Sequence, residues 1–421
     1  MKILGGLLLF VLSTQIANAQ QLQFVYDNNI YQTNIKTVQC YNAKKEQSMP
    51  VILLKSAEQL KFSFDDLSGG SKNYWYTVEH CTSDWKSSRL SALDYLDGLT
   101  DDRIVNYDYS SNTLQKYTHY TVTLPNDQIK IKISGNYLLK VYLDGNLQKP
   151  MISQRFYVVD NQVNVGAEVA PSAQVSDRSF NQKINFTIFH TTPIQNPYSD
   201  IKAVVMQNGI PQTAVTNTKP AFIKPGALIY NELTSNDFRA GAEFRKFDTR
   251  SLRYKGDHVQ DIYSDTTINV ILFQDINESN NKYASLFDEN GAFFIRNQDQ
   301  RDADTESDYA HVLFTLNAAA PGANGDVYVV GRFNNYRLTD ESKLSYEPSR
   351  KRFYGNLLLK QGLYDYKYIW KDNLSGKMND TQFEGSFFET ENAYQVFVYF
   401  RKPGSRWDEL IGYSSINTAR R

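Results

Sequence analysis

The sequence predicts an all-β protein, because strand-like alternation recurs along the chain and sustained helical periodicity does not. Apolar and polar residues alternate with a period of two in segment after segment, which is typical of strands in antiparallel sheets. The 421 residues include 29 Tyr and 24 Phe, and both residue types favour strands. A chain of this length has room for two or three β-sandwich domains.

The alternating segments are distributed from the first third of the chain to its end. In each of them, most residues of one face are Tyr, Phe, Val, Ile or Leu. The segments are 74–81, 120–124, 137–143, 184–190, 364–370 and 394–400. One short helical pattern, formed by Leu90, Leu93 and Leu96, precedes Gly98. Short strands separated by turn residues predict sandwiches of antiparallel sheets.

Changes in composition predict where the domains begin and end. A strand around Phe156 ends at the polar residues 160–162, and the polar run 297–308 is expected to be a hinge or an exposed loop. We therefore expect three consecutive immunoglobulin-like β-sandwich domains after a short leader. The predicted parts are residues 1–19, 20–160, 161–308 (with long loops) and 309–421.

The first 19 residues have the features of a secretory signal peptide. Lys2 is followed by a mostly apolar stretch, and Ala17-Asn18-Ala19 has the small-x-small form of a cleavage site. The rest of the sequence has no run of the roughly 18 apolar residues that a membrane helix needs. The mature protein is therefore expected in an oxidising compartment, such as a periplasm, without spanning a membrane.

Charge and cysteine content argue against several classes of function. Lys and Arg number 45 against 46 Asp and Glu, so no broad basic surface for nucleic acid is expected. Two Cys are too few for a multi-Cys zinc site or a disulfide-dense scaffold. Cys40 and Cys81 are either a disulfide or two buried free thiols, and the sequence leaves both alternatives open.

No pattern of catalytic residues emerges. His80 and Cys81 are neighbours on a predicted strand, so their side chains point to opposite faces and do not form a nucleophile–base pair. Residues 80–85 are interpreted as a strand end and a turn, with Asp84 bonding the backbone and Trp85 packing. The acidic loops lack the Gly of a calcium-binding loop, and the five His are scattered. We expect no catalytic residues, no metal and no cofactor.

A motif near the C-terminus resembles the early-set immunoglobulin-like domains that include starch- and glycogen-binding modules. It is spread over residues 326–336, 345–357 and 362–370. Binding modules of that kind stack exposed Trp faces on sugar rings, and Tyr336 stands at the Trp position here. The alternatives are a secreted carbohydrate-binding protein and a structural sandwich with Phe333 and Tyr366 in its core. We favour the second, since a fold does not imply a function.

A series of motifs in the first domain occurs in one order and spacing. The motifs are residues 50–56, 60–67, 76–85, 88–90, 94–98, 104–113, 117–120, 124–126, 134–137 and 155–159. Together they resemble the type IX secretion system plug protein family. The similarity is dense over residues 25–160 and continues more loosely through 243–248 and 406–412.

The resemblance implies a non-enzymatic periplasmic protein that binds the giant outer-membrane translocon barrel of that system. It would seal the periplasmic end of the barrel when no substrate is in transit, as a monomer bound one to one. An outer-membrane barrel can reach about 36 strands, and so wide a pore leaks unless it is blocked. The motif residues that are candidates for a structural or docking role are His80, Asp84, Trp85, Arg89, Asp94, Gly98, Asn112, Tyr117 and Tyr120.

Overall fold

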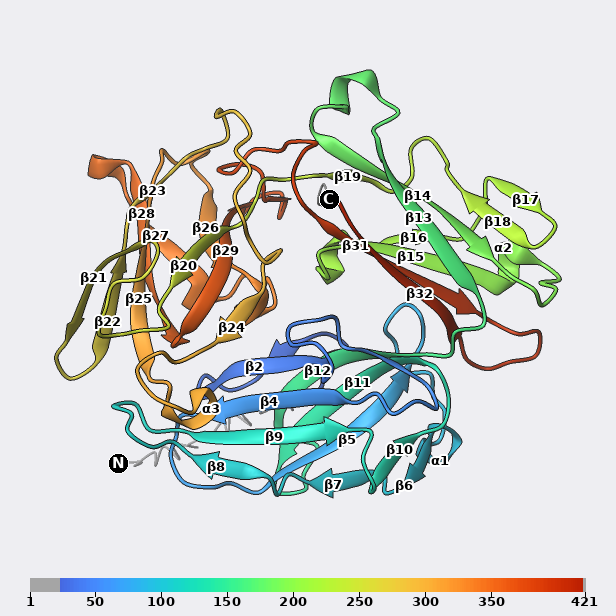
Figure 1. Ribbon diagram of the computed structural model, residues 1–421, viewed down its shortest axis with the longest axis horizontal. Helices are drawn as coiled ribbons and strands as arrows, with labels where there is room; N and C mark the ends of the chain where they lie inside the picture. The colour runs from blue at the N-terminus through green and yellow to red at the C-terminus, as the bar shows by residue number, and fades with distance from the viewer. Residues whose placement is uncertain (1–22, 419–421) are drawn as a thin grey trace, which may run out of the picture.

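A computed structural model describes residues 23–418 and shows an all-β protein, which confirms the predicted fold class (Figure 1). Within these residues the α-helices are short: α1 (Ala92–Tyr95), α2 (Pro197–Asp200) and α3 (Ala303–Glu306). The first of them falls in the predicted helical pattern. The predicted signal peptide lies outside the described residues. Over the described part of the chain, the helices are all too short to cross a membrane.

The strands gather into three bodies, and the first of them comprises residues 23–160. Its main sheets have the orders β1-β12-β11-β5-β7, with β3 beside β12, and β2-β4-β9-β8; β6 pairs with β10. The strands are β1 (Asn29–Ile30), β2 (Ile35–Asn42), β3 (Val51–Leu53), β4 (Leu60–Asp66), β5 (Tyr74–Cys81), β6 (Leu96–Gly98), β7 (Asp101–Arg103), β8 (Tyr107–Tyr109), β9 (Thr118–Leu124), β10 (Ile129–Ile131), β11 (Gly135–Leu143) and β12 (Pro150–Val159). Alternate residues of β5, from Tyr74 to His80, are buried as the pattern predicts.

The second body combines strands from the middle and from the end of the chain. Its two sheets have the orders β13-β14-β18-β17, with β19 beside β14, and β16-β15-β31-β32. The strands are β13 (Asn164–Pro171), β14 (Asn181–Phe189), β15 (Ile201–Gln207), β16 (Val215–Asn217), β17 (Phe222–Lys224), β18 (Ala227–Tyr230), β19 (Asp237–Arg239), β31 (Ala393–Phe400) and β32 (Glu409–Asn417). Figure 1 shows the red C-terminal strands packed among the green ones.

The third body lies between these two parts in the sequence. Its strands form one folded sheet with the order β20-β29-β26-β27-β28-β25-β22-β21. They are β20 (Arg245–Asp248), β21 (Val259–Ser264), β22 (Ile268–Leu272), β23 (Asp275–Ile276), β24 (Phe293–Ile295), β25 (Tyr309–Asn317), β26 (Gly325–Val330), β27 (Lys343–Glu347), β28 (Arg352–Lys360), β29 (Gly362–Asp372) and β30 (Met378–Asn379). Its core contains Tyr364, Tyr366 and Tyr368, one predicted face of β29.

The pairing of β15 with β31 corrects the expected boundary at residue 308. Val204 lies opposite Phe397, and β20 lies opposite β29, so a cut at residue 308 divides sheets of two bodies. Composition reports local changes only, whereas strand pairing joins residues far apart in the chain. We propose a division into a first unit (residues 23–160), a second unit (161–240 with 391–418) and a third unit (243–388) inserted into the second.

Candidate functional site

The motif at residues 80–85 begins inside the first unit. The His80 side chain is fully buried, and its ring packs edge-on against Tyr137 with 5.1 Å between ring centroids. Its Nε2 atom lies 3.4 Å from the carbonyl oxygen of Ser134. Burial lowers the pKa of His80 to about 4, so the ring is neutral at physiological pH. His80 therefore contributes to the core of the first unit.

Cys40 and Cys81 are free thiols, so the disulfide alternative is not formed in the structure. Cys40 lies in β2 and Cys81 at the end of β5, and these strands belong to different sheets. Burial raises the pKa of each thiol to about 12. Both remain protonated near neutral pH, and a protonated thiol is a poor nucleophile.

The turn after β5 is bonded to the second unit. The backbone N–H of Ser83 donates to Oδ2 of Asp408 at 3.0 Å, and Lys202 Nζ donates to the Ser83 hydroxyl at 2.8 Å. Close by, the Tyr399 hydroxyl donates to the side-chain oxygen of Asn136 at 2.8 Å. These directional polar contacts fix the position of the second unit on the first, because the groups are paired with each other in the interface in place of water.

Trp85 continues this first–second interface through aromatic contacts. The Arg155 guanidinium lies 4.4 Å from the Trp85 ring centroid, and Tyr157 packs edge-on against the same ring at 5.3 Å. Tyr157 in turn stacks on Phe397 of the second unit at 4.3 Å. Trp85 has a φ of 58°, which is unusual for a bulky residue, so tertiary contacts must hold this conformation.

Replacing Trp85 with Ala is expected to lower the free energy of unfolding by about 2 kcal/mol, through lost packing and the lost cation–π contact. Tyr157 loses a packing partner in this variant, and Tyr157 stacks on Phe397 of β31. Amide hydrogen exchange in β31 should therefore become faster. Trp75 lies within β5, beside Gly145 and away from this turn, so Trp75→Ala is the matched control. We expect this control to leave exchange in β31 unchanged. Equal exchange in wild type and Trp85→Ala would contradict the role assigned to Trp85.

Asp84, Arg89 and Asp94 lie at the surface near this interface. The Thr82 hydroxyl donates to the Asp84 carboxylate at 2.6 Å, and this bond, with Lys86, lowers the Asp84 pKa to about 2. Arg89 is exposed. Asp94 accepts a hydrogen bond from Ser91 N at 3.0 Å at the start of α1. Of the three, Arg89 remains open to a partner molecule.

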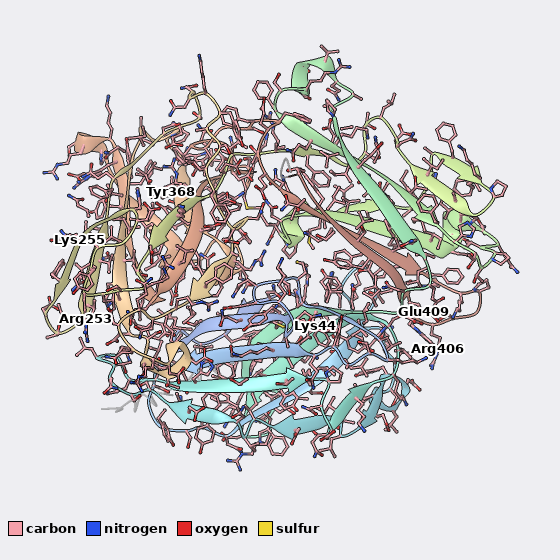
Figure 2. The ribbon with its side chains drawn as sticks, in the orientation of Figure 1. Lys44, Arg253, Lys255, Tyr368, Arg406 and Glu409 are labelled. Atoms are coloured by element: carbon pink, nitrogen blue, oxygen red, sulfur yellow. The ribbon has the colours of Figure 1, made fainter. Side chains whose placement is uncertain are left out.

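Arg406 of the second unit lies beside α1 of the first. Its Nη2 lies 3.6 Å from Oδ2 of Asp94, and Figure 2 shows Arg406 and Glu409 at the edge where the second unit approaches the first. Arg406 and Asp408 belong to the sequence motif 406–412. The structure therefore brings two motifs of the sequence, 76–85 and 406–412, to one interface.

Gly98 and Tyr120 have structural roles within the first unit. Gly98 has a φ of 95°, and a Cβ atom there would lie 2.2 Å from the carbonyl oxygen of Gln128. Tyr120 stacks on Phe64 at 5.1 Å, and its hydroxyl accepts a hydrogen bond from Lys72 N at 2.7 Å. Both residues are thus explained by packing and turn geometry rather than by docking.

A second interface joins the first unit to the third through a buried charge network. Asp65 in β4 is fully buried, and Lys360 Nζ donates to its Oδ2 at 2.7 Å. The Tyr309 hydroxyl donates to the same oxygen at 2.7 Å, and Nδ1 of His119 lies 2.6 Å from Oδ1. Lys360 is 1% exposed. A carboxylate and an ammonium group so fully removed from water must remain paired.

The polar run 297–308, expected to be a hinge or an exposed loop, forms part of this first–third interface: Arg301 and Asp302 are exposed, whereas Ser307 and Asp308 are buried. Asn112 donates to Glu306 at 2.9 Å, and the Tyr117 hydroxyl donates to the carbonyl oxygen of Ser307 at 2.8 Å. The Tyr117 ring also lies 4.2 Å from Lys360 Nζ. Two candidate residues of the first unit thus bind the loop that precedes β25.

Sequence reasoning missed the charged members of both interfaces. Asp65 and His119 are cross-strand partners on β4 and β9, on the face opposite Phe64. A polar face of a strand normally points to solvent, so alternation alone does not distinguish it from a face covered by another unit. The complementary charges of Asp65 and Lys360 were the available signal, but the sequence gives no pairing between residues so distant.

The structure does not support the carbohydrate-binding alternative. Tyr336 is buried rather than open to a sugar, and its hydroxyl donates to the carbonyl oxygen of Gly291 at 3.4 Å. Trp370 is also buried. Tyr366 lies in the core of the third unit, and Phe333 is partly buried and packs against that core. Both positions agree with the structural interpretation of the motif.

The fold is that of an all-β protein built from several units. Residues from the sequence motifs of the first unit lie in the two interfaces described above and help to hold the units together. A family model described as type 9 secretion system plug protein, first domain, matches residues 35–160. The crystal structure of a hypothetical protein from Parabacteroides merdae is 34% identical, with a TM-score of 0.89, and covers 94% of this chain and 100% of that chain. The chain belongs to the type IX secretion system plug protein family.

Two further comparisons add nothing to this assignment. The structure of a Salmonella alpha-2-macroglobulin mutant aligns at 8% identity with a TM-score of 0.17, covering 92% of this chain and 27% of that chain. At this TM-score and identity, the similarity gives no information about the fold or function of this chain. The comparison with curated proteins found no match.

Proposed function

We propose that this protein binds the periplasmic end of the type IX translocon barrel and seals it when no substrate is in transit. Its family assigns it to a plug role in that secretion system. The observation that carries the proposal is the closed arrangement of three units, in which the first unit binds both others through buried polar groups. A body that blocks a wide pore must keep its shape, and these contacts oppose separation of the units.

A third contact completes this arrangement. Ile210 of the second unit packs with Phe244, Val330 and Tyr336 of the third unit in one apolar cluster. Each unit therefore contacts the other two, and Figure 1 shows the three groups of strands arranged around a common centre. The proposed plug acts through shape and surface contact, with no catalytic step, as a periplasmic monomer in a one-to-one complex.

The test is a pull-down of the tagged protein from its own cells in gentle detergent, followed by mass spectrometry. A very large outer-membrane barrel protein should be recovered in equimolar amount. Arg89→Ala should weaken recovery if residues 80–98 face the barrel, whereas Lys44→Ala, at another exposed site, is the control. A deletion strain should also admit large polar antibiotics that the parent excludes.

Two results would count against the proposed function. One is recovery of no barrel protein under conditions in which known barrel partners are retained. The other is unchanged permeability of the deletion strain while secretion is idle. If wild type and Arg89→Ala both recover the barrel protein in equal amount, docking occurs on another surface. The plug role then stands.

A further inference from the structure

The outer end of the second unit carries an exposed apolar cluster, far from the first and third units (Figure 1). We call it the tip: Phe189 at the end of β14, Tyr198 in α2, and Phe222 and Ile223 in β17. These side chains are 50, 54, 60 and 47% exposed, respectively. Four large apolar side chains so close to one turn differ from the scattered single residues of an ordinary surface.

The β17–β18 hairpin of the tip exposes apolar groups on both of its faces. Ile223 lies opposite Leu228, whose side chain is in the core, so Ile223 points to the core side of the sheet. Phe222 is its neighbour in the strand and points to the opposite side. A flat protein surface would cover one face of the hairpin only. A lipid interface surrounds an inserted hairpin and covers both faces.

The charges of the tip favour an anionic surface. Residues 217–230 contain Lys219 and Lys224 and no Asp or Glu. Both lysines are exposed, and the structure shows no ion pair for either of them among residues 23–418. Asp200, at the end of the neighbouring α2, accepts a hydrogen bond from Ser199 Oγ at 2.6 Å. The tip therefore presents two unneutralised ammonium groups.

We propose that the tip inserts into the headgroup region of an anionic phospholipid surface. The aromatic and aliphatic side chains enter the interface, while the lysines bind headgroup phosphates, as in other amphipathic membrane-surface segments. Long lysine side chains can reach the phosphates while their methylene groups cover apolar surface. This contact requires no barrel protein, so it is a separate property from the proposed docking on the translocon.

The experiment is flotation of the purified full-length mature chain with vesicles of phosphatidylethanolamine and phosphatidylglycerol. We expect wild type to float at low salt and to bind pure phosphatidylcholine vesicles weakly. The double variant Phe222→Ser/Ile223→Ser should lower the partition coefficient roughly tenfold. Lys219→Gln/Lys224→Gln should remove the preference for anionic lipid and its salt dependence. Phe287→Ser, at a side chain 72% exposed in the third unit, is the matched control and should bind like wild type.

Failure of wild type to float would overturn the proposal, as would equal binding by the tip variant and wild type. If the tip variant loses the barrel in the pull-down while wild type never binds vesicles, the tip is a protein contact and the lipid proposal is wrong. Because the vesicles contain no barrel, wild type that floats but recovers no barrel would refute the plug role alone.

Discussion

Replacing Lys360 with Met is expected to destabilise the protein by about 3–5 kcal/mol, the usual cost of removing one partner from a buried ion pair. Asp65 has no exposed surface, so after the substitution its charge would lack its ammonium partner in a water-free site. The Tyr309 hydroxyl and the His119 ring still contact the Asp65 carboxylate, but these contacts do not replace the ammonium charge beside it. Lys360 also donates to the carbonyl oxygen of Asp304 at 2.7 Å, and this bond is lost too.

Urea unfolding followed by circular dichroism measures this effect. Lys44→Met is the control, since Lys44 is 68% exposed in its pair with Glu58 and surface pairs contribute less than about 1 kcal/mol. The double variant Asp65→Asn/Lys360→Met should recover part of the loss, because it leaves no unpaired charge. A midpoint for Lys360→Met equal to that of wild type would show that the pair does not stabilise the first–third interface.

The behaviour of strands β4 and β29 shows how much of the fold could be predicted from sequence. Burial of Phe64 and Tyr366 follows from a period of two, which is a local property of a strand. The opposite faces carry Asp65 and Asp365, which look like solvent-facing residues in the sequence. Both are buried because other segments cover them, and no local pattern reports which distant segment does so.

The same limit explains the candidate site. The order and spacing of motifs in the first unit indicated the family, and they identified residues 80–85 as important. They did not show that Ser83 would bind Asp408, because that pairing joins the first unit to a strand pair at the other end of the chain. The pairing of β15 with β31 escaped prediction for the same reason. Long-range pairing depends on packing of whole units, whereas motif spacing depends on neighbours in the chain.

Raising the pH from 5 to 8 is expected to destabilise the third unit, because two buried carboxyl groups there must lose their protons. Burial, with the nearby charge of Asp288, raises the pKa of Asp365 to about 8. Burial raises the pKa of Asp288 to about 7. The Asp365 carboxyl accepts hydrogen bonds from Glu289 N at 2.6 Å and Gly291 N at 3.1 Å. These neutral donors do not offset the cost of burying two like charges.

The sign of the pH effect follows from proton binding. A carboxyl group with a folded pKa above its unfolded value of about 4 binds more protons in the native state between those two values. The free energy of unfolding therefore falls as the pH rises toward the folded pKa, by about 1.4 kcal/mol per pH unit for each group, and it levels off above that pKa. Asp65 behaves oppositely: burial would raise its pKa, but Lys360 and His119 outweigh burial and lower it. Its contribution is lost only in acid, so it does not obscure the change near neutral pH.

Urea midpoints measured from pH 5 to pH 8 test this expectation. Asp365→Asn keeps an oxygen for the Glu289 and Gly291 amides but carries no charge, so its midpoint should depend much less on pH and exceed that of wild type at pH 8. Asp127→Asn, at an exposed turn, is the control and should retain the wild-type pH dependence. Equal pH dependence of Asp365→Asn and wild type would contradict the expectation.

The position of these carboxyl groups determines where the loss of stability should begin. Asp288 accepts a hydrogen bond from Phe244 N, and Phe244 packs with Tyr336 and Ile210 where the third unit meets the second. Ionisation of Asp288 and Asp365 should therefore loosen this contact first. Amide hydrogen exchange in residues 288–293 should accelerate with rising pH by more than the intrinsic exchange rate of an unfolded chain does. Amides in β4 and β9, at the first–third interface, should stay protected. The protein would then be weakened at the second–third interface, while the first–second and first–third interfaces still hold the three units together.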